Sequence, residues 1–367
     1  MKKITIAKEE EANISLNDEI EKFLKDRGAK KVGFANKESL AGPPNADISY
    51  VIPEAKSAIS YALLFDRDKI RDYLAKKEGA FHEHETNRFD LNYRSVKISR
   101  ELASWLKQKG YDAKHIISNN NYKKEIKGWR ATMPPTLSHR YVAVASGVGS
   151  FGWSGNVGMK GIGTTILLGT LVTTAELKPT EPIPPEEGFC TKCKLCTKVC
   201  SAQMFSKEEE VTFTLGGHEY SHAKRNGYVR CQYVCGGFTG LHPSKKWSTY
   251  SPGRFPIPET NKEIYKMMGK ALRRYQTWPK RTDVKSKYKD GYENEAAPGV
   301  DVRLTCGMCQ NLCWGNAKDT ADNYRILTNS GCIIQNPDGS IDIFPSEEAE
   351  KHFEALPEKH RKKYTLN

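Results

Sequence analysis

Hydrophobic runs are short in this sequence. The most apolar one, Thr164 to Val172, is far too short to cross a bilayer. No apolar stretch follows the two lysines near the N-terminus and there is no twin arginine, so the pattern of a secretory signal is missing. We therefore expect a soluble, cytoplasmic protein without a membrane partner.

Acidic residues are in deficit. The 367 residues include 57 Lys and Arg against 44 Asp and Glu, which gives a formal net charge of +13. Such an excess suits an acidic partner: a nucleic acid, an acidic electron carrier or a phosphate-bearing cofactor. The positive residues are scattered, with small clusters such as Arg273–Arg274 and Arg361–Lys363. This distribution favours a solvated basic surface, so a nucleic-acid partner is not expected, although the charge alone does not exclude one.

A proline-rich segment divides the chain. Strands alternate with helices over residues 1–178, which predicts an α/β or α+β domain. Residues 179–188 include four prolines and three glutamates and are typical of an extended linker. The cysteine motifs follow in a second domain, residues 189–330, with a long insertion at 201–305. Residues 331–367 are charged and helical in character, and we expect a C-terminal tail on the surface.

Ten cysteines are many for a cytoplasmic chain, and in that compartment they indicate metal or redox chemistry rather than disulfides. Four of them form a C-x2-C-x2-C-x3-C motif, and three more form C-x2-C-x3-C: Cys190, Cys193, Cys196 and Cys200; Cys306, Cys309 and Cys313. The first spacing is that of bacterial ferredoxins, in which the fourth cysteine binds the other cluster. A zinc site, with its two separated ligand pairs, does not explain such a run.

The crossing rule assigns these cysteines to two 4Fe–4S clusters. The first cluster takes Cys190, Cys193, Cys196 and Cys313. The second takes Cys200, Cys306 and Cys309 and needs one more ligand, for which Cys231 and Cys235 are the candidates. Cys332 stands alone in the sequence and is interpreted as an inert buried thiol.

Glycine occupies seven positions between residues 147 and 163. Such a segment allows backbone amides to approach a ligand closely, and the alternative is a plain turn-rich connection. Gly147, Gly149 and Gly152 match G-x-G-x-x-G, but no Asp or Glu lies about 20 residues further on to bind a nicotinamide ribose.

These motifs together resemble a known family. The similar segments are SGVGSFGWSGNVG (146–158), LLGTLVTTAEL (167–177), FCTKCKLCTKVC (189–200), Arg230–Cys231 and TCGMCQNLCWGN (305–316). They resemble the cobalamin-dependent, double-cluster reductases, which comprise the reductive dehalogenases and the epoxyqueuosine reductases of tRNA maturation. The resemblance implies an α+β fold: a nitroreductase-like α/β core that binds cobalamin, with an attached ferredoxin-like domain for the two clusters. It also implies that Cys231 is the fourth ligand of the second cluster and that the glycine segment and the next strand line the corrinoid pocket: Gly147, Gly149, Gly152, Gly155, Gly161, Gly163 and Thr164.

The resemblance implies a reductase that acts on a small organic or organohalide substrate, with electrons from a ferredoxin or a flavodoxin. Residues 131–141 contain no Asp or Glu, where epoxyqueuosine reductases have a catalytic aspartate, so epoxyqueuosine is not the expected substrate. The proton must then come from another group, and His139, Arg140 and Tyr141 lie just before the glycine segment. The alternatives are an electron-transfer activator that re-reduces a corrinoid protein, and a tRNA-modifying reductase. The His82-x-His84 pair lacks a third ligand, and we expect both histidines in a loop.

Overall fold

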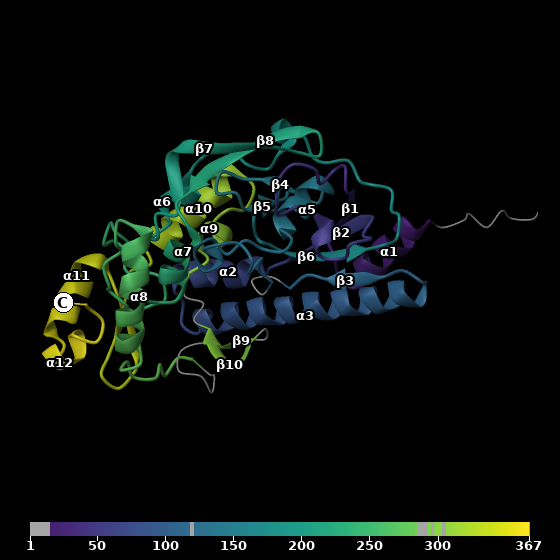
Figure 1. Cartoon of the computed structure of the whole chain (residues 1–367). Helices are drawn as coiled ribbons and strands as arrows, with labels where there is room; N and C mark the ends of the chain where they lie inside the picture. The colour runs from purple at the N-terminus through teal and green to yellow at the C-terminus, as the bar shows by residue number, and fades with distance from the viewer. Residues whose placement is uncertain (1–14, 118–120, 285–291, 295–296, 303–305, 367) are drawn as a thin grey trace, which may run out of the picture.

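The computed structural model describes residues 15–117, 121–284, 292–294, 297–302 and 306–366. It is a mixed α/β protein built around a four-stranded antiparallel sheet (Figure 1). The strand order is β1-β2-β6-β3, with β1 at Lys31–Asn36, β2 at Ser57–Leu64, β6 at Ile166–Thr173 and β3 at Ala113–His115. Strand β2 pairs with β6 along its whole length and with β1 from Ser57 to Ala62, so it lies inside the sheet.

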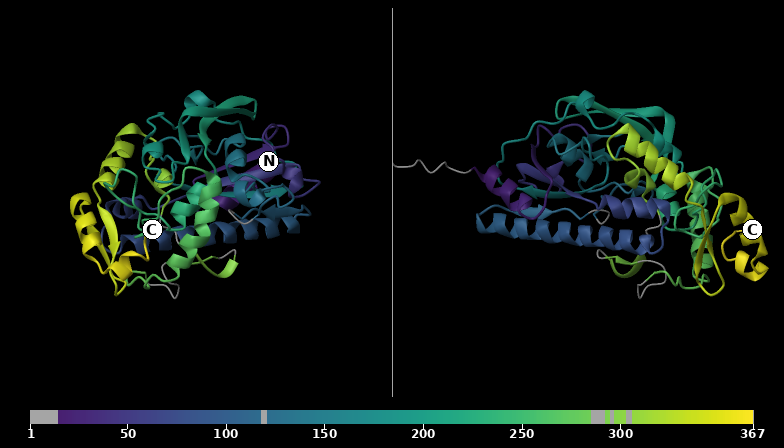
Figure 2. Two further views of the ribbon diagram at one scale, coloured as in Figure 1. Left: turned by 60° about the vertical axis from the view of Figure 1, so that its left-hand side comes forward. Right: turned by 180° about the vertical axis from the view of Figure 1, so that it is seen from behind.

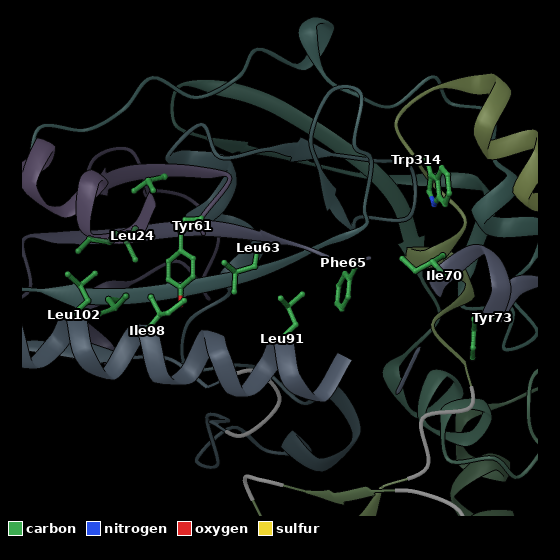
Figure 3. Packing of buried hydrophobic residues seen from close by; sticks show 14 of the residues in the cluster. Leu24, Tyr61, Leu63, Phe65, Ile70, Tyr73, Leu91, Ile98, Leu102 and Trp314 are labelled. Carbon is green, nitrogen blue, oxygen red and sulfur yellow. The ribbon is translucent and has the colours of Figure 1, made fainter. Parts of the chain in front are cut away.

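The alternation of side chains along β2 places a core on each face of the sheet. Ile59, Tyr61 and Leu63 pack in one core with the apolar residues of α1 (Leu16–Lys25) and α3 (Ala80–Gln108). Ala58 and Ala62 pack in the other with α5 (His139–Ala145). Figure 3 shows the leucine and isoleucine side chains of α3 pointing toward the strand. Because helices cover both faces of the sheet, the sequence of β2 is an almost continuous apolar run.

Tyr61 provides a test of this core. Its hydroxyl is buried and lies 2.8 Å from both the carbonyl of Ser95 and the hydroxyl of Ser99 on α3. We expect Tyr61→Phe to lower the free energy of unfolding by about 1–3 kcal/mol, because these partners lose a hydrogen bond inside the core. Denaturant titration measures the loss of stability. Tyr93→Phe is the control, since Tyr93 lies on α3, the helix of Ser95 and Ser99, and is 62% exposed. Equal losses in the two variants would contradict the expectation.

The two domains expected from the sequence share one core. Trp314, directly after the second cysteine motif, packs with Ile70 of α2 (Arg67–Ala75) in the same cluster as the sheet residues (Figure 3). The guanidinium groups of Arg67 and Arg71 lie 4.8 and 4.7 Å from the centre of the Trp314 ring. Residues 179–188 therefore connect two segments of the chain that share one hydrophobic core.

The insertion at 201–305 and the C-terminal residues build the other end of the molecule. The described elements after β6 include α6 (Leu195–Lys198), β7 (Phe205–Leu215), β8 (His218–Arg225), α7 (Tyr228–Cys235), α8 (Asn261–Tyr275), β9 (Tyr292–Asn294), β10 (Ala297–Val302), α9 (Met308–Asn311) and α10 (Ala317–Thr328). They are followed by β11 (Cys332–Gln335), β12 (Ile341–Phe344), α11 (Ser346–Ala355) and α12 (Glu358–Arg361). In the described part of the chain no helix is both long and apolar enough to cross a membrane.

Residues 331–367 differ from the expected tail. A hairpin and two helices lie beside α8 at the end of the molecule away from α1 (Figure 2). Ile334, Phe353 and Tyr364 are buried in a third core together with residues of α7 and α8. The composition of this segment suggested a surface location because its few apolar side chains are surrounded by charged ones. Their spacing nevertheless places them on one face of each element, and that face is buried.

Candidate iron–sulfur site

The four cysteines assigned to the first cluster line one cavity. Cys190, Cys193 and Cys196 surround it from the loop before α6 and from α6 itself, and Cys313 closes it from the turn after α9. Between them, Lys192 and Lys194 adopt left-handed backbone with φ of 53° and 56°. Each left-handed residue reverses the backbone locally and costs about 1–2 kcal/mol, which a bound group or tight packing must offset. The local turn thus brings the thiols of Cys190, Cys193 and Cys196 together on one side of the cavity.

Burial raises the pKa of two thiols of this group, Cys196 and Cys313. It raises the pKa of Cys196 to about 12, and the neighbouring Cys313, Cys190 and Cys193 act in the same direction. The pKa of Cys313 is also raised, first by burial and then by Cys190 and Cys193 among its neighbours. Thiols of this kind stay protonated near neutral pH unless a metal replaces the proton.

A second group contains five cysteines. Burial raises the pKa of Cys200 to about 12, and Cys306 and Cys231 add to the effect. The pKa of Cys309 is raised by burial and then by Cys200, Cys231 and Cys306. Cys231 is therefore a neighbour of the three cysteines that the crossing rule assigns to the second cluster.

The fifth cysteine of this group, Cys235, lies one helical turn further along α7. Its Sγ is 3.7 Å from Cys231 Sγ, and the Cys306 thiol is its other close neighbour. In the described residues no three His, Cys, Asp or Glu side chains converge closely enough to hold a single metal ion. The four thiolates of a cubane bind four different iron atoms, so their sulfur atoms lie further apart than the ligands of a single metal ion do.

Residues of the glycine segment donate hydrogen bonds to both groups. The Trp153 backbone N–H donates to Cys190 Sγ at 3.3 Å, and the Asn156 amide donates to Cys309 Sγ at 3.6 Å. From the other side, the Met204 N–H donates to Cys200 Sγ at 3.3 Å. Hydrogen bonds to ligand sulfurs are one of the means by which a protein sets a cluster potential.

The glycines themselves pack against protein atoms. A Cβ at Gly163 would lie 2.2 Å from the Cys313 carbonyl, one at Gly152 would lie 2.8 Å from the Phe189 ring, and one at Gly147 would lie 2.2 Å from the Glu181 carbonyl. A Cβ at Gly149 would lie 2.6 Å from the Gly158 carbonyl, and one at Gly155 would lie 3.0 Å from the His222 ring. Only Gly161, among the glycines assigned to the corrinoid, has open space where its side chain would be.

Thr164 belongs to the same contact. Its hydroxyl donates to the Gln310 carbonyl at 2.6 Å, and its N–H donates to the Cys313 carbonyl at 2.9 Å. The missing side chains thus make room for neighbouring protein atoms, which at Gly163 belong to the cysteine loop, rather than for a ligand. These residues form no open cradle for a corrinoid, and the corrinoid assignment stays a prediction.

The three residues expected to supply a proton lie side by side on α5 but face different surroundings. His139 Nδ1 lies 2.8 Å from the Thr170 hydroxyl on β6, and burial lowers the pKa of His139 to about 4. The imidazole is then neutral at neutral pH and is a poor acid. The Tyr141 ring packs edge-on against Phe151 and Phe213 in the core.

Arg140 leads instead to a network that sequence reasoning missed. It donates to the Gly155 carbonyl at 2.7 Å and to the Tyr228 hydroxyl at 3.1 Å, and Arg225 donates to the same hydroxyl at 2.6 Å. Burial opposes ionisation of Tyr228, but Arg225 and Arg140 outweigh it, so the pKa of Tyr228 is lowered. The sequence position of Tyr228 could have indicated this network, because Tyr228 lies three residues before Cys231, at the start of the helix that carries Cys231.

The segment that lacks a carboxylate also lies at this helix. Helix α4 (Trp129–Thr132) lies against α7, and the Gln232 amide contacts Met133 Sδ at 2.6 Å. The position where the resembling family has its aspartate is therefore close to the helix of Cys231 and Cys235.

No protein-family model and no curated protein matches the chain. Among solved structures it is similar to a selenomethionine-labelled epoxyqueuosine reductase, with 17% identity and a TM-score of 0.37 over 63% of this chain and 60% of that one. A catabolic reductive dehalogenase is 16% identical, with a TM-score of 0.44 over 60% of this chain and 30% of that one. The epoxyqueuosine reductase of Bacillus subtilis is 16% identical, with a TM-score of 0.38 over 86% and 81%.

These are the two kinds of enzyme that the motifs resemble. The chain spans less than two thirds of the length of the first two, 60% and 30%. All three TM-scores are below 0.5, so the proposals below depend on the residues of this chain.

Proposed function

We propose that the chain is an iron–sulfur oxidoreductase that reduces a small organic or organohalide substrate with electrons from a ferredoxin or a flavodoxin. Cys190, Cys193, Cys196 and Cys313 would hold one 4Fe–4S cluster, and Cys200, Cys231, Cys306 and Cys309 the other. When bound, such clusters store and pass single electrons. The acceptor that the sequence resemblance implies is a cobalamin.

The observation that carries the proposal is the assembly of two cysteine groups from three distant segments. Cys196 of the first group is among the neighbours that raise the pKa of Cys309 in the second, so the groups adjoin each other. Both receive hydrogen bonds from the segment between α5 and β6, which belongs to the α/β core. Electrons could therefore pass between the groups and reach the core, an arrangement that an independent ferredoxin does not need.

A second candidate is an electron-transfer activator that re-reduces the corrinoid of a partner protein. It is favoured by the packing of the glycine segment, which is closed by protein atoms at all but one of its assigned glycines. In this candidate the clusters are the same and the corrinoid belongs to the partner.

Anaerobic purification separates the two candidates. Iron, sulfide and the visible spectrum are measured before and after addition of cobalamin, with about eight irons per chain expected for two cubanes. Uptake of about one corrinoid per chain supports the reductase, and two clusters without uptake supports the activator. Zinc in place of iron, or iron near zero, would refute both.

The substrate prediction uses the reduced, cobalamin-loaded protein. We expect halide release from aryl halides and no turnover of tRNA that contains epoxyqueuosine. A threonine hydroxyl at residues 131–136 cannot replace a carboxylic acid, since its pKa is far above the working range. Turnover of the tRNA at an enzyme-like rate would contradict this prediction. Halide release that survives both Tyr141→Phe and His139→Ala would remove both residues as proton donors.

A further inference from the structure

A buried polar cluster on α3 lies beside the second cysteine group. Phe81, His84, Glu85 and Arg88 follow one another at helical spacing, so they share one face of α3. His84 and Glu85 are completely buried. The expectation that His84 lies in a loop was therefore wrong, because the spacing of these four residues already indicates one face of a helix.

Several polar atoms of this cluster are unsatisfied. Within the described residues, His84 Nδ1, Glu85 Oε2 and the Tyr250 hydroxyl are buried and have no hydrogen-bond partner. His84 Nε2 contacts the Asn311 amide at 3.1 Å, and Glu85 Oε1 accepts a long bond of 3.4 Å from Arg88. Unsatisfied buried polar groups are costly and call for an explanation beyond packing.

The cluster reaches Cys306 through two side chains. The Tyr73 ring packs against His84, tilted by 39° with the ring centres 4.3 Å apart, and stacks on Tyr250 at 4.7 Å. The Tyr73 hydroxyl donates to the Cys306 carbonyl at 3.2 Å. Arg88 extends toward the same loop, since its Nη1 is 3.6 Å from the position a Cβ would take at Gly307. Glu85 is thus connected to the second cysteine group by Tyr73 on one side and Arg88 on the other.

The groups around Glu85 differ in the pH range where they ionise. Burial raises the pKa of Glu85 to about 7 although Arg88 opposes it, and burial lowers the pKa of His84 to about 3. Burial raises the pKa values of Tyr73 and Tyr250. The pKa of Arg88 is raised as well, because Glu85 and Tyr73 outweigh the effect of burial. Cys231, Cys306 and burial together raise the pKa of Cys235 well above its usual range. Asp72, Arg281 and Asp283 face Tyr250 from the far side. Two other groups nearby also ionise near neutral pH. The hydrogen bond with Cys235 lowers the pKa of Cys306 to about 7, although a bound cluster would hold Cys306 as a thiolate, and burial lowers the pKa of Lys76, 6.0 Å from the Tyr250 ring, to about 7. Glu85 is the carboxyl group of this cluster that changes charge in the same range.

We propose that Glu85 takes up a proton when the second cysteine group, with its cluster bound, receives an electron. The proposal rests on the proposed function. One electron comes from the reduced ferredoxin or flavodoxin, one proton comes from solvent, and the Glu85 carboxylate becomes a carboxylic acid. Added negative charge in a low-dielectric interior raises the pKa of a nearby carboxyl, so the two events favour each other. Glu85 is a positioning residue in this scheme, because it acts through Tyr73 and Arg88.

The test is the reduction potential of each cluster as a function of pH, measured by dithionite titration followed by electron paramagnetic resonance. In the wild type, the potential of the second cluster should fall with rising pH over part of the range from pH 6 to 10. One proton per electron corresponds to a tenfold change per pH unit, about 59 mV. Glu85→Gln should abolish this slope, and Glu85→Asp should keep it.

The control is Glu83→Gln, which removes an exposed carboxylate two residues away on the same helix and should leave the slope unchanged. A potential that is independent of pH in the wild type, or a slope that persists in Glu85→Gln, would overturn the proposal. Failure of the proposed function would be seen separately, as a wild-type protein that assembles no second cluster. If Glu85→Gln does not assemble the cluster, Glu85→Asp still decides the outcome: its slope should move to a lower pH range, because the ordinary pKa of Asp is below that of Glu, and an unchanged range would overturn the proposal.

Discussion

Replacing Cys231 by serine is expected to lower the iron content from about eight to about four per chain, the loss of one cubane. The physical reason is the position of Cys231 on α7, where it is a neighbour of Cys200, Cys306 and Cys309. A serine hydroxyl does not replace the thiolate that iron prefers. Iron and sulfide analysis of anaerobically reconstituted protein measures the loss, and the potential of the remaining cluster shows which one was lost.

Two other cysteines serve as controls for this prediction. Cys332→Ser should keep both clusters, because Cys332 is buried in β11 and its thiol contacts the Lys245 carbonyl instead. Cys235→Ser should also keep the iron, since Cys235 contacts Cys231 and Cys306 but is not among the groups that shift the pKa of Cys200 or Cys309. If Cys235→Ser halves the iron while Cys231→Ser does not, the two cysteines of α7 have been assigned in the wrong order.

Gly163→Ala is expected to disrupt the first cluster and to destabilise the protein more than most single substitutions do. The new methyl would lie 2.2 Å from the Cys313 carbonyl and 2.4 Å from the Gly315 nitrogen, so the loop that bears Cys313 must move. Overpacking costs about 1–3 kcal/mol, and the left-handed backbone adds about 1–2 kcal/mol for any residue with a Cβ. Iron analysis and anaerobic denaturant titration measure the two effects.

Gly161→Ala is a matched control for this variant. The φ of Gly161 is 73° and that of Gly163 is 69°, so the backbone strain is the same, but a methyl at Gly161 meets no atom within 4 Å. It should lower stability by about 1–2 kcal/mol and leave the iron content unchanged. Equal behaviour of the two variants would show that the glycine does not support the cysteine loop. A loss of iron in Gly163→Ala would also mean that substitutions in this segment affect more than cobalamin uptake.

The cysteine groups were predictable from sequence because their spacing is local. Three thiols separated by two residues each are brought together by a single turn, and the crossing rule then gives Cys313 to the first group. The choice between Cys231 and Cys235 could not be made from residues alone, since the two are one turn apart on one helix. It depended on a resemblance and stays a prediction; in the structure Cys231 is among the neighbours that raise the pKa of Cys200 and Cys309, while Cys235 hydrogen-bonds with Cys306.

Other features depend on contacts between distant segments, which a single sequence does not reveal. Nothing local in the glycine segment indicates that its neighbour is the Cys313 loop, about 150 residues later in the chain. Glu85 is different, because the face formed with Phe81, His84 and Arg88 can be found by its helical period. Its proximity to Cys306 still needs the fold, since Tyr73 connects them from another helix.

The shared core around Trp314 has a consequence for how the protein responds to damage. Trp314 directly follows Cys313, and its ring contacts two arginines of α2 within the same apolar cluster as the central strand. If Cys190, Cys193, Cys196 and Cys313 hold a cluster as proposed, its oxidative loss would free the loop that bears Trp314, and the sheet would lose part of its core packing. Susceptibility to a protease would then extend from the cysteine loop to the sheet in one cooperative step, so an oxidised molecule becomes a substrate for degradation as a whole rather than persisting with an intact but inactive core.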